Sequence, residues 1–323
     1  MKQKILVPKG FNEEAVELMK ETAEVHFFKG STPKERANEL ADADAAIAGG
    51  VTEELLERAP KLKVIARFGV GYDDCDVDAA TRHKVYITHT PGVLTNAVSD
   101  LTMLLILSLA RGIRYADRYT RSEWEKNLKD YPSSGSDLAD KTLGIIGLGR
   151  IGYEVAKRAK AFGMNIVYHD QVPNKAAEND FDARRLDLDD LLKQSDFVTI
   201  HCSLTPKTTK LVGDREIGLM KRSAFLVNTA RGPIVDQKAL TKALQEKRIA
   251  GAGLDVFEKE PISLDDPLLK LDNVILTPHM GSLTREARRG MALMDAKNIS
   301  QVLKGRVPDN VVPEQRGLVF TKE

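Results

Sequence analysis

Short apolar runs alternate with polar, helix-like stretches along most of this chain. From Met1 to about Asn96, the apolar runs predict strands, and segments such as 13–22 and 52–58 predict amphipathic helices between them. Strands that alternate with helices are joined by right-handed crossovers within a parallel sheet. The first part of the chain is therefore predicted to be an α/β domain. Its predicted strands are Ile5–Val7, Val25–Phe28, Ala45–Ala48, Leu62–Ala66 and Val85–Thr88.

A second series of apolar runs begins at Thr142. These runs are rich in β-branched residues, as strands buried on both faces of a sheet are. We therefore predict two Rossmann-like or flavodoxin-like, doubly wound parallel-sheet domains with a cleft between them. The predicted strands of the second domain are Thr142–Ile146, Ile166–His169, Phe197–His201, Ala224–Asn228, Gly251–Val256 and Val274–Thr277.

Two further helices predict how the domains are connected. A long helix, capped by Ser99 or Asp100, is expected to run toward Trp124 and to bridge the two domains. A last helix over 285–303 leads into a polar tail that is expected to pack back on the first domain. The pattern thus predicts a discontinuous substrate domain of residues 1–98 plus 286–323, and a cofactor domain of residues 99–285.

Length and composition support two globular domains and a small-molecule partner. A chain of 323 residues exceeds the size at which single hydrophobic cores stop growing. Hydrophobic residues form 42% of the chain and charged residues 29%, which is typical of soluble proteins. The net charge of +1 creates no field that attracts nucleic acid or anionic lipid. The longest apolar stretch, within 98–110, is shorter than the ~20 residues of a membrane span. We therefore expect neither nucleic-acid nor membrane binding.

The cysteine content points to a reducing compartment. Cys75 and Cys202 are the two cysteines, and their spacing matches neither a disulfide framework nor a zinc site. The apolar run near the first residue is too short for a signal peptide. We expect a cytoplasmic protein without a bound metal.

Three glycines follow the first strand of the second series. Gly147, Gly149 and Gly152 form a GxGxxG pattern ahead of a predicted helix over 153–162. Gly147 is expected to permit a tight turn, and Gly149 to let the backbone approach a pyrophosphate. Gly152 is expected to allow close packing of the helix on the strand. A glycine-rich turn of purely structural use is the alternative interpretation.

Asp170 makes the dinucleotide interpretation more specific. It ends the next predicted strand, about twenty residues on, where a carboxylate accepts a hydrogen bond from the adenosine ribose 2′-OH. The same carboxylate would repel a 2′-phosphate. The pattern therefore favours NAD(H) over NADP(H) as the cofactor.

Three polar segments at predicted strand ends carry the candidate catalytic residues. Ligands bind at the carboxyl ends of strands in an open parallel sheet. Reduction of a 2-keto acid needs a cation at the carboxylate and carbonyl, a proton donor at the C2 oxygen, and a group that keeps the donor charged and oriented. Arg231, His279 and Glu260 respectively match these needs. The segments are 227–232, 255–261 and 277–282.

With these segments, the chain resembles the D-isomer-specific 2-hydroxyacid dehydrogenase family over nearly its whole length. The similar stretches are GLGRIG, LMKRSAFLVNTARGPIVD, GLDVFEKEP and LTPHMGS, in that order. The resemblance implies the same three catalytic roles, and it implies that the backbone N–H groups of Val70 and Gly71 hold the substrate carboxylate. It also implies cofactor contacts from Arg150, Ile151, Cys202 (through its backbone), Thr229, Ala230, Asp255 (at the nicotinamide carboxamide), His279, Gly281 and Ser282. A homodimer is expected from the family and from the apolar helix at 101–109, for which interdomain packing is the alternative explanation.

The stretches HTPGVLTNAVSDLT, CSLTPKTTKLVG and PHMGSLTREAR look most like the glyoxylate, hydroxypyruvate and 2-ketogluconate reductases of that family. The chain departs from them at Asp170, where many members carry Arg, and at Asp100, where Glu is more common. Since the sequence ends at Glu323, we expect it to lack the C-terminal regulatory domain of many phosphoglycerate dehydrogenases.

We expect an NAD(H)-dependent reductase of glyoxylate or hydroxypyruvate. A 2-ketogluconate reductase and a phosphoglycerate dehydrogenase are the alternative enzymes. A catalytically idle, NAD-binding regulator similar to a co-repressor is the non-enzymatic alternative, which the intact set of Arg231, Glu260 and His279 disfavours. No interaction tail, charge run or repeat in the sequence favours a structural interaction protein.

Overall fold

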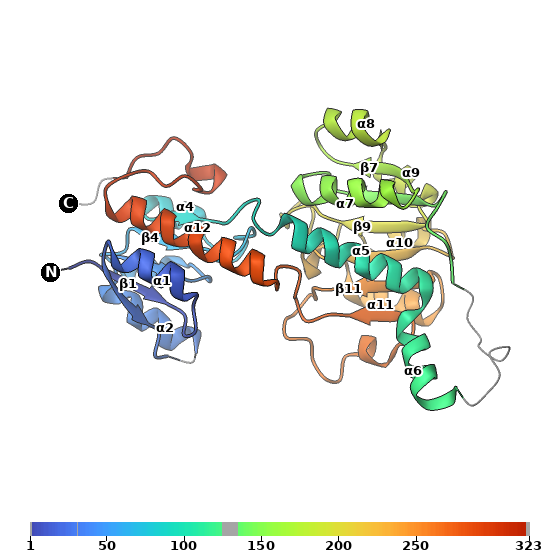
Figure 1. The fold of residues 1–323 in the computed structure, drawn as a ribbon, viewed down its shortest axis with the longest axis horizontal. Coiled ribbons are helices and arrows are strands. Elements are labelled where there is room, and N and C mark those ends of the chain that lie inside the picture. Colours follow the sequence, from blue (N-terminus) through green and yellow to red (C-terminus); the bar gives the residue numbers. More distant parts are fainter. Residues whose placement is uncertain (1, 31, 125–134, 321–323) are drawn as a thin grey trace. The chain divides into compact units, whose positions relative to one another are not determined.

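The computed structural model describes residues 2–30, 32–124 and 135–320, and the chain divides into two compact units (Figure 1). Unit 1 comprises Met1–Leu94 and Ser282–Glu323, and unit 2 comprises Thr95–Gly281. The C-terminal segment thus returns to the unit that contains the N-terminus. The unit boundaries fall at 94/95 and 281/282, where the sequence pattern predicts 98/99 and 285/286.

Unit 1 is built on a five-stranded sheet with the order β2-β1-β3-β4-β5. All neighbouring strands are parallel. This is the flavodoxin-like order, in which the direction of winding changes between β1 and β3. The predicted strands of this region are all present, with slightly different ends. They are β1 (Lys4–Val7), β2 (Glu24–Phe27), β3 (Ala45–Ile47), β4 (Val64–Ala66) and β5 (Tyr86–Thr88).

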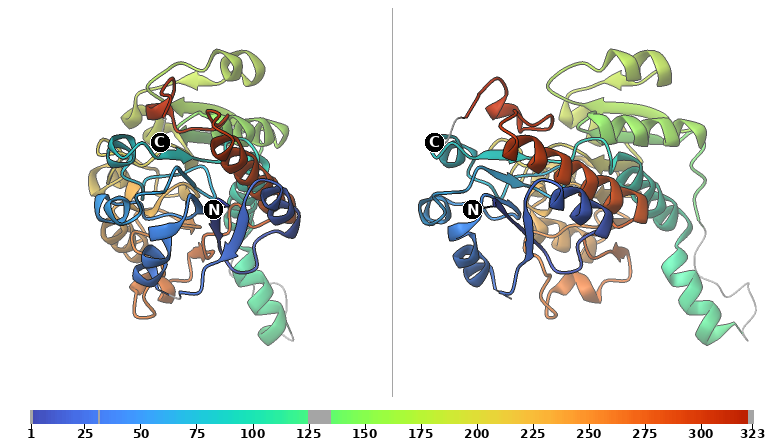
Figure 2. Two further views of the ribbon diagram at one scale, coloured as in Figure 1. Left: turned by 90° about the vertical axis from the view of Figure 1, so that its left-hand side faces the viewer. Right: turned by 60° about the vertical axis from the view of Figure 1, so that its left-hand side comes forward.

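Helices cover both faces of this sheet because successive strand residues point to opposite sides. Ile5 and Val7 of β1 face the core that α1 and α12 close, and Leu6 faces the core under α3 and α4. Figures 1 and 2 both show α1 and α12 lying side by side. The helices of unit 1 are α1 (Glu13–Lys20), α2 (Pro33–Glu39), α3 (Glu53–Arg58), α4 (Val77–Arg82) and α12 (Arg285–Leu303), with short 3-10 helices at Leu40–Asp42 and Pro313–Gln315.

Unit 2 contains a seven-stranded parallel sheet with the order β12-β11-β10-β9-β6-β7-β8. This is the Rossmann order, and the winding changes direction between β6 and β9. Arg184–Arg185 form the edge strand β8, which the apolar pattern does not predict because both residues are charged and exposed. The other strands match the predicted ones closely. They are β6 (Thr142–Ile146), β7 (Asn165–His169), β9 (Phe197–Ile200), β10 (Phe225–Asn228), β11 (Gly251–Leu254) and β12 (Val274–Leu276).

Two hydrophobic cores lie on the two faces of the unit 2 sheet. α5 and α7 pack together on one face, as Figure 1 shows, and α9, α10 and α11 cover the other. The helices are α5 (Thr95–Arg111), α6 (Ile113–Glu123), α7 (Arg150–Ala161), α8 (Lys175–Phe181), α9 (Leu188–Gln194), α10 (Asp214–Leu219) and α11 (Gln237–Gln245), with 3-10 helices at Gly232–Ile234 and Pro267–Lys270.

The predicted long bridging helix is wrong in three respects. Helix α5 begins at Thr95, so Ser99 does not cap it but lies buried within it, where its hydroxyl donates to the Thr95 carbonyl. The helix ends before Gly112, whose left-handed backbone (φ 57°) starts a separate helix, α6. Helix α5 also lies wholly in unit 2.

Within the described residues, no single helix combines the length and hydropathy of a membrane span. In that part of the chain, α5 and α6 taken together have such a length and composition, but they are bent by 59° at their junction. Figure 2 shows α6 extending away from the rest of unit 2.

Candidate functional site

The last residues of six parallel strands in unit 2 stand in one row. His169, Ile146, Ile200, Asn228, Leu254 and Leu276 are successive partners across β7, β6, β9, β10, β11 and β12. The loops that follow these strands therefore leave the sheet along one edge. The glycine-rich turn and all three candidate catalytic residues lie in loops along this edge.

Two glycines of the turn after β6 are required by close contacts, and the third faces open space. At Gly147 (φ 91°) a Cβ would lie 2.5 Å from the backbone nitrogen of Cys202, which follows the neighbouring strand. At Gly152 a Cβ would lie 2.4 Å from the carbonyl oxygen of Gly147, so helix α7 can approach its strand only with a glycine there. At Gly149, the N-cap of α7, nothing lies within 4 Å of a Cβ position.

These features fit a dinucleotide. The open space at Gly149 lets an anionic group approach the backbone, and the N-terminus of the twelve-residue helix α7 favours negative charge. Arg150 and Ile151, two of the predicted cofactor residues, are the first two residues of that helix.

Asp170 lies against the glycine-rich turn. It follows the last residue of β7, and its Oδ2 accepts a hydrogen bond of 2.7 Å from the backbone N–H of Leu148. Arg185 of β8 donates to the backbone carbonyls of Asp170 (2.8 Å) and Gln171 (2.9 Å), which fixes this strand end. The carboxylate is thus held beside the predicted phosphate turn, where a ribose hydroxyl is expected.

Two titratable side chains follow β9 at the same edge. Burial lowers the pKa of His201 to about 3, and its Nε2 lies 3.0 Å from the hydroxyl of Thr199. Burial raises the pKa of the Cys202 thiol to about 11. Both pKa values lie far from pH 7, so neither group is matched to proton transfer there, and the thiol is not the reactive thiolate.

His279 and Glu260 form a hydrogen-bonded pair in unit 2 that is suited to proton transfer. The Nδ1–H of His279 donates to Oε2 of Glu260 across 2.6 Å. The other carboxylate oxygen of Glu260 accepts a hydrogen bond of 3.0 Å from the backbone N–H of Phe257. Glu260 is thereby fixed in orientation, and the Nε2 atom of His279 remains as the ring nitrogen that can exchange a proton with a substrate.

Asp255 holds the loop that carries His279. Its Oδ1 accepts from the Thr277 hydroxyl (2.6 Å) and the Met280 backbone (2.8 Å), and its Oδ2 accepts from the Gly281 backbone (2.8 Å). Its backbone carbonyl accepts from the His279 N–H at 2.8 Å. Since His279 has a left-handed backbone (φ 52°), this clamp offsets the strain of that conformation. The Asp255 carboxylate, predicted as a cofactor contact, is also a support for the histidine.

The loop after β10 carries Arg231. Buried Asn228 accepts from the Ala230 backbone N–H (3.0 Å) and donates to the Arg231 carbonyl (2.9 Å). The Thr229 hydroxyl lies 2.9 Å from that of Thr102 in α5. At Gly232, a Cβ would overlap the backbone of Phe257 at 1.9 Å, so this loop packs directly on the one that leads to Glu260.

Removal of the Asn228 side chain should loosen the Arg231 loop. In Asn228→Ala, the half-buried Ala230 N–H loses its partner and the Arg231 C=O keeps only the N–H of Ile234, which should cost roughly 1–3 kcal/mol of unfolding free energy. Urea unfolding would measure this change. Asn228→Asp keeps the acceptor for Ala230 and should lie between Asn228→Ala and the unmodified protein. Equal stability of all three proteins would contradict the support role.

The predicted substrate-carboxylate loop lies in unit 1, directly after β4. The ring Nδ1–H of His89 donates to the Val70 carbonyl at 3.0 Å, and the Gly69 carbonyl accepts from Thr90 at 2.9 Å. These contacts hold the carbonyl side of the loop, whereas the predicted contacts to substrate involve the N–H groups of Val70 and Gly71. Ser282, a predicted cofactor residue, also belongs to unit 1.

Several supporting residues were not predicted from the sequence. Asn228 stands inside the same NTARG stretch as Arg231, so its position beside a catalytic candidate was a usable signal. Thr102 and Arg185 come from distant segments and carried no such signal. In the described part of the chain, no cluster of His, Cys, Asp or Glu side chains could hold a metal ion.

Comparison with known proteins gives a consistent result. The sequence model of the NAD binding domain of D-isomer specific 2-hydroxyacid dehydrogenases matches residues 103–281. A glyoxylate reductase from Thermococcus litoralis is 44% identical, with 97% of each chain covered. A D-3-phosphoglycerate dehydrogenase from Methanocaldococcus jannaschii is also 44% identical, covering 96% of this chain but 59% of that protein.

A solved structure extends the comparison to the fold. An NADPH-dependent glyoxylate/hydroxypyruvate reductase from Sinorhizobium meliloti, in complex with NADP and malonate, is 30% identical with a TM-score of 0.87. The match covers 100% of this chain and 99% of that structure.

Proposed function

We propose that this chain, which belongs to the D-isomer-specific 2-hydroxyacid dehydrogenase family, reduces glyoxylate or hydroxypyruvate with NADH. Membership of the family makes it an oxidoreductase of 2-hydroxy acids with a nicotinamide dinucleotide cofactor. The observation that carries this proposal is the 2.6 Å contact between His279 and Glu260, which joins two loops. The loop that leads to Glu260 packs on the loop of Arg231. Similarity to the glyoxylate reductases supports the substrate class.

Each residue of the proposed catalytic set has one task. Arg231 binds the carboxylate and polarises the C2 carbonyl, since its planar guanidinium can address two oxygens at once. His279 gives a proton to the C2 oxygen, and the anionic Glu260 stabilises the charged imidazole and fixes its ring. The reduced nicotinamide, when bound, supplies the hydride that reaches C2. The hydride and the proton together convert the keto acid into a 2-hydroxy acid.

Gly147, Gly149 and Gly152 would hold the cofactor phosphates at the start of α7, with Arg150 and Ile151 beside them. The backbone of Cys202 and the segment of Thr229 and Ala230 would contact the nucleotide from the neighbouring strands, and Gly281 and Ser282 from the His279 loop. The N–H groups of Val70 and Gly71 would bind the substrate carboxylate.

The proposed preference for NADH rests on Asp170. Its carboxylate sits beside the glycine-rich turn and would accept hydrogen bonds from ribose hydroxyls, whereas it would repel a 2′-phosphate. The cationic Arg185 lies close to the same strand end, but it is bound to the backbone carbonyls of Asp170 and Gln171.

The Asp170 proposal makes a quantitative prediction. The lost hydrogen bond and the charge repulsion should together favour NADH over NADPH by roughly 30-fold to 1,000-fold in kcat/KM. Asp170→Ala should reduce that ratio by about tenfold or more. Initial rates with each cofactor would measure both values. Equal use of the two cofactors by the unmodified enzyme would refute the assigned role of Asp170.

A panel of 2-keto acids tests the proposed function itself. Glyoxylate, hydroxypyruvate, 2-ketogluconate and phosphohydroxypyruvate would each be assayed with NADH and with NADPH. We expect the highest kcat/KM for glyoxylate or hydroxypyruvate with NADH. Highest activity on phosphohydroxypyruvate would instead support a phosphoglycerate dehydrogenase, a candidate favoured by the Methanocaldococcus relative. No oxidation of NADH with any keto acid would support a regulator. The homodimer and the cytoplasmic location stay predictions.

A further inference from the structure

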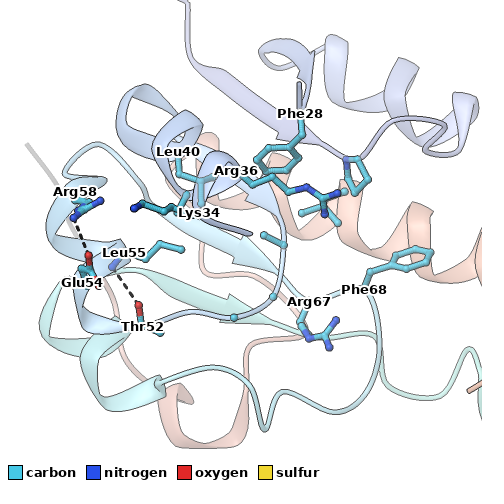
Figure 3. Close-up of a pocket in the computed structure, with 16 residues that line it drawn as sticks. Phe28, Lys34, Arg36, Leu40, Thr52, Glu54, Leu55, Arg58, Arg67 and Phe68 are labelled. Atoms are coloured by element: carbon cyan, nitrogen blue, oxygen red, sulfur yellow. Dashed lines mark hydrogen bonds and ion pairs between the residues drawn. The ribbon is translucent and has the colours of Figure 1, made fainter. Parts of the chain in front are cut away.

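The loop that follows β4 in unit 1 is held at both of its ends. Figure 3 shows the side chains of Arg67 and Phe68 where the chain leaves this strand. The Nε of Arg67 donates to the carboxylate of Asp74 across 2.9 Å. The Phe68 ring packs edge-to-face against that of Phe11, with 5.4 Å between the ring centroids. The segment 69–73 therefore forms a loop between two anchored positions.

The backbone of this loop is held through its carbonyl groups. The Thr90 N–H donates to the Gly69 carbonyl at 2.9 Å, and the His89 ring donates to the Val70 carbonyl at 3.0 Å. Among the described residues, none accepts a hydrogen bond from the N–H of Val70 or of Gly71. These two N–H groups can therefore bind a carboxylate, and their direction depends on how the loop is held.

Tyr72 gives the loop a further anchor. Its hydroxyl donates to the carboxylate of Glu314, whose two oxygens lie 3.2 and 3.1 Å away. Its ring packs edge-to-face on that of His89, with 5.5 Å between the centroids. Burial, and then the charge of Glu314, raises the pKa of Tyr72 to about 12, so the phenol is a hydrogen-bond donor at neutral pH. Tyr72 thus contacts both the side chain that holds Val70 and the C-terminal part of the chain.

Glu314 stands on a segment that is itself fixed to β5. The Val312 N–H donates to the Ile87 carbonyl at 3.0 Å. The buried side chain of Gln315 accepts from the Ile87 N–H at 2.8 Å and donates to the Val85 carbonyl at 2.9 Å. Because its neighbours on both sides are bound to the strand, Glu314 offers Tyr72 an acceptor at a defined position.

We propose that Tyr72 and Glu314 are positioning residues, whose hydrogen bond keeps the N–H groups of Val70 and Gly71 in the orientation that binds the substrate carboxylate. This inference rests on the proposed function, which assigns the carboxylate to those N–H groups. The carboxylate is present in the substrate and in the transition state alike, so the pair acts on KM and leaves kcat nearly unchanged. The C-terminal segment thereby takes part in substrate binding.

Three single variants test the hydrogen bond by steady-state kinetics with glyoxylate or hydroxypyruvate at saturating NADH. Tyr72→Phe keeps the ring and removes the donor, and Glu314→Ala removes the acceptor. Each should raise KM by roughly fivefold to tenfold, with kcat within about twofold of the unmodified enzyme. Glu314→Gln keeps an acceptor oxygen and should restore KM to within about twofold of the original value.

A double variant shows whether the two side chains act through one contact. Tyr72→Phe combined with Glu314→Ala should raise KM no further than either single change, because both remove the same hydrogen bond. The matched control is Tyr153→Phe, since the Tyr153 hydroxyl also donates to an exposed carboxylate, that of Asp180, but in unit 2. This control should leave KM unchanged. Thermal unfolding of each variant checks that the fold is retained.

Unchanged KM in Tyr72→Phe, or multiplied effects in the double variant, would overturn the proposal. If the unmodified protein reduced no 2-keto acid, the proposed function would fail, and binding of oxalate would decide this inference without turnover. Calorimetry on the full-length protein saturated with NADH measures that affinity. We expect Tyr72→Phe to weaken oxalate by about fivefold or more. Equal affinity of the two proteins, or no binding to the unmodified one, would overturn the role of Tyr72 and Glu314.

Discussion

His279→Gln is expected to lower kcat/KM for glyoxylate or hydroxypyruvate by roughly 100-fold to 10,000-fold, the usual contribution of a positioned general acid. Glutamine can fill the space and make hydrogen bonds, but it cannot release a proton to the C2 oxygen. Affinity for NADH, measured by the change in its fluorescence on binding, should stay close to that of the unmodified protein. This combination separates the loss of proton transfer from the loss of the fold.

The chain offers a matched control for this substitution. His26 in β2 also lies near a carboxylate, with its Nε2 3.7 Å from Glu24, but it belongs to the sheet of unit 1 and is half exposed. His26→Gln should leave kcat/KM within a factor of about two. If His279→Gln retained more than a tenth of the activity, another group would have to be the proton donor.

Arg231→Lys is expected to lose about 30-fold or more in kcat/KM, while NADH binding persists. An ammonium is a point charge that cannot contact a carboxylate and a carbonyl oxygen in one plane, as a guanidinium can. Loss of one charge-assisted hydrogen bond at a desolvated site costs roughly 2 kcal/mol, which corresponds to this factor. Steady-state kinetics at low keto-acid concentration would measure the change.

Arg215→Lys is the control for the charge-conserving substitution. Arg215 forms an exposed ion pair with Asp189 in the same unit at 2.8 Å, and its side chain is 62% exposed. Exposed pairs contribute about 0–1 kcal/mol, so this variant should have unchanged kinetics. If Arg231→Lys had the same kcat/KM as Arg215→Lys, Arg231 would not bind the substrate as proposed.

The proposed catalytic residues could be named from the sequence because each follows an apolar strand. Strand residues pair in register, so Asn228, Leu254 and Leu276 form one row across the sheet. Whatever follows them emerges at one edge, and Arg231 and His279 each stand three positions beyond the row. The hydrogen bond between His279 and Glu260 confirms that two of these loops meet.

The glycine-rich turn could also be predicted from the sequence. A glycine with a positive φ, or one whose Cβ would meet the backbone, accepts no other residue without strain, and Gly147 and Gly152 are such positions. Asp170 could be placed by counting to the end of the next strand, and its contact with Leu148 agrees with that position.

The helix boundaries near Gly112 and the edge strand β8 were harder to predict from the sequence. Ser99 is of a residue type that often caps helices, but it lies inside α5. Its hydroxyl donates to the Thr95 carbonyl of the same helix and also lies near the Ile151 carbonyl of α7. Arg184 and Arg185 pair with β7 through backbone hydrogen bonds, which any side chains permit. A pattern of apolar and polar side chains cannot predict a strand whose pairing depends only on backbone groups.

The sequence alone determined the two parallel sheets, the dinucleotide turn and the identity of the proposed catalytic set, because hydrophobic periodicity and glycine geometry act over a few neighbouring residues. Only the tertiary structure decided that Asp255 clamps the His279 loop and that Asn228 supports the Arg231 loop. Buried polar groups must find hydrogen-bond partners wherever the fold brings them, and those partners lie on other segments of the chain.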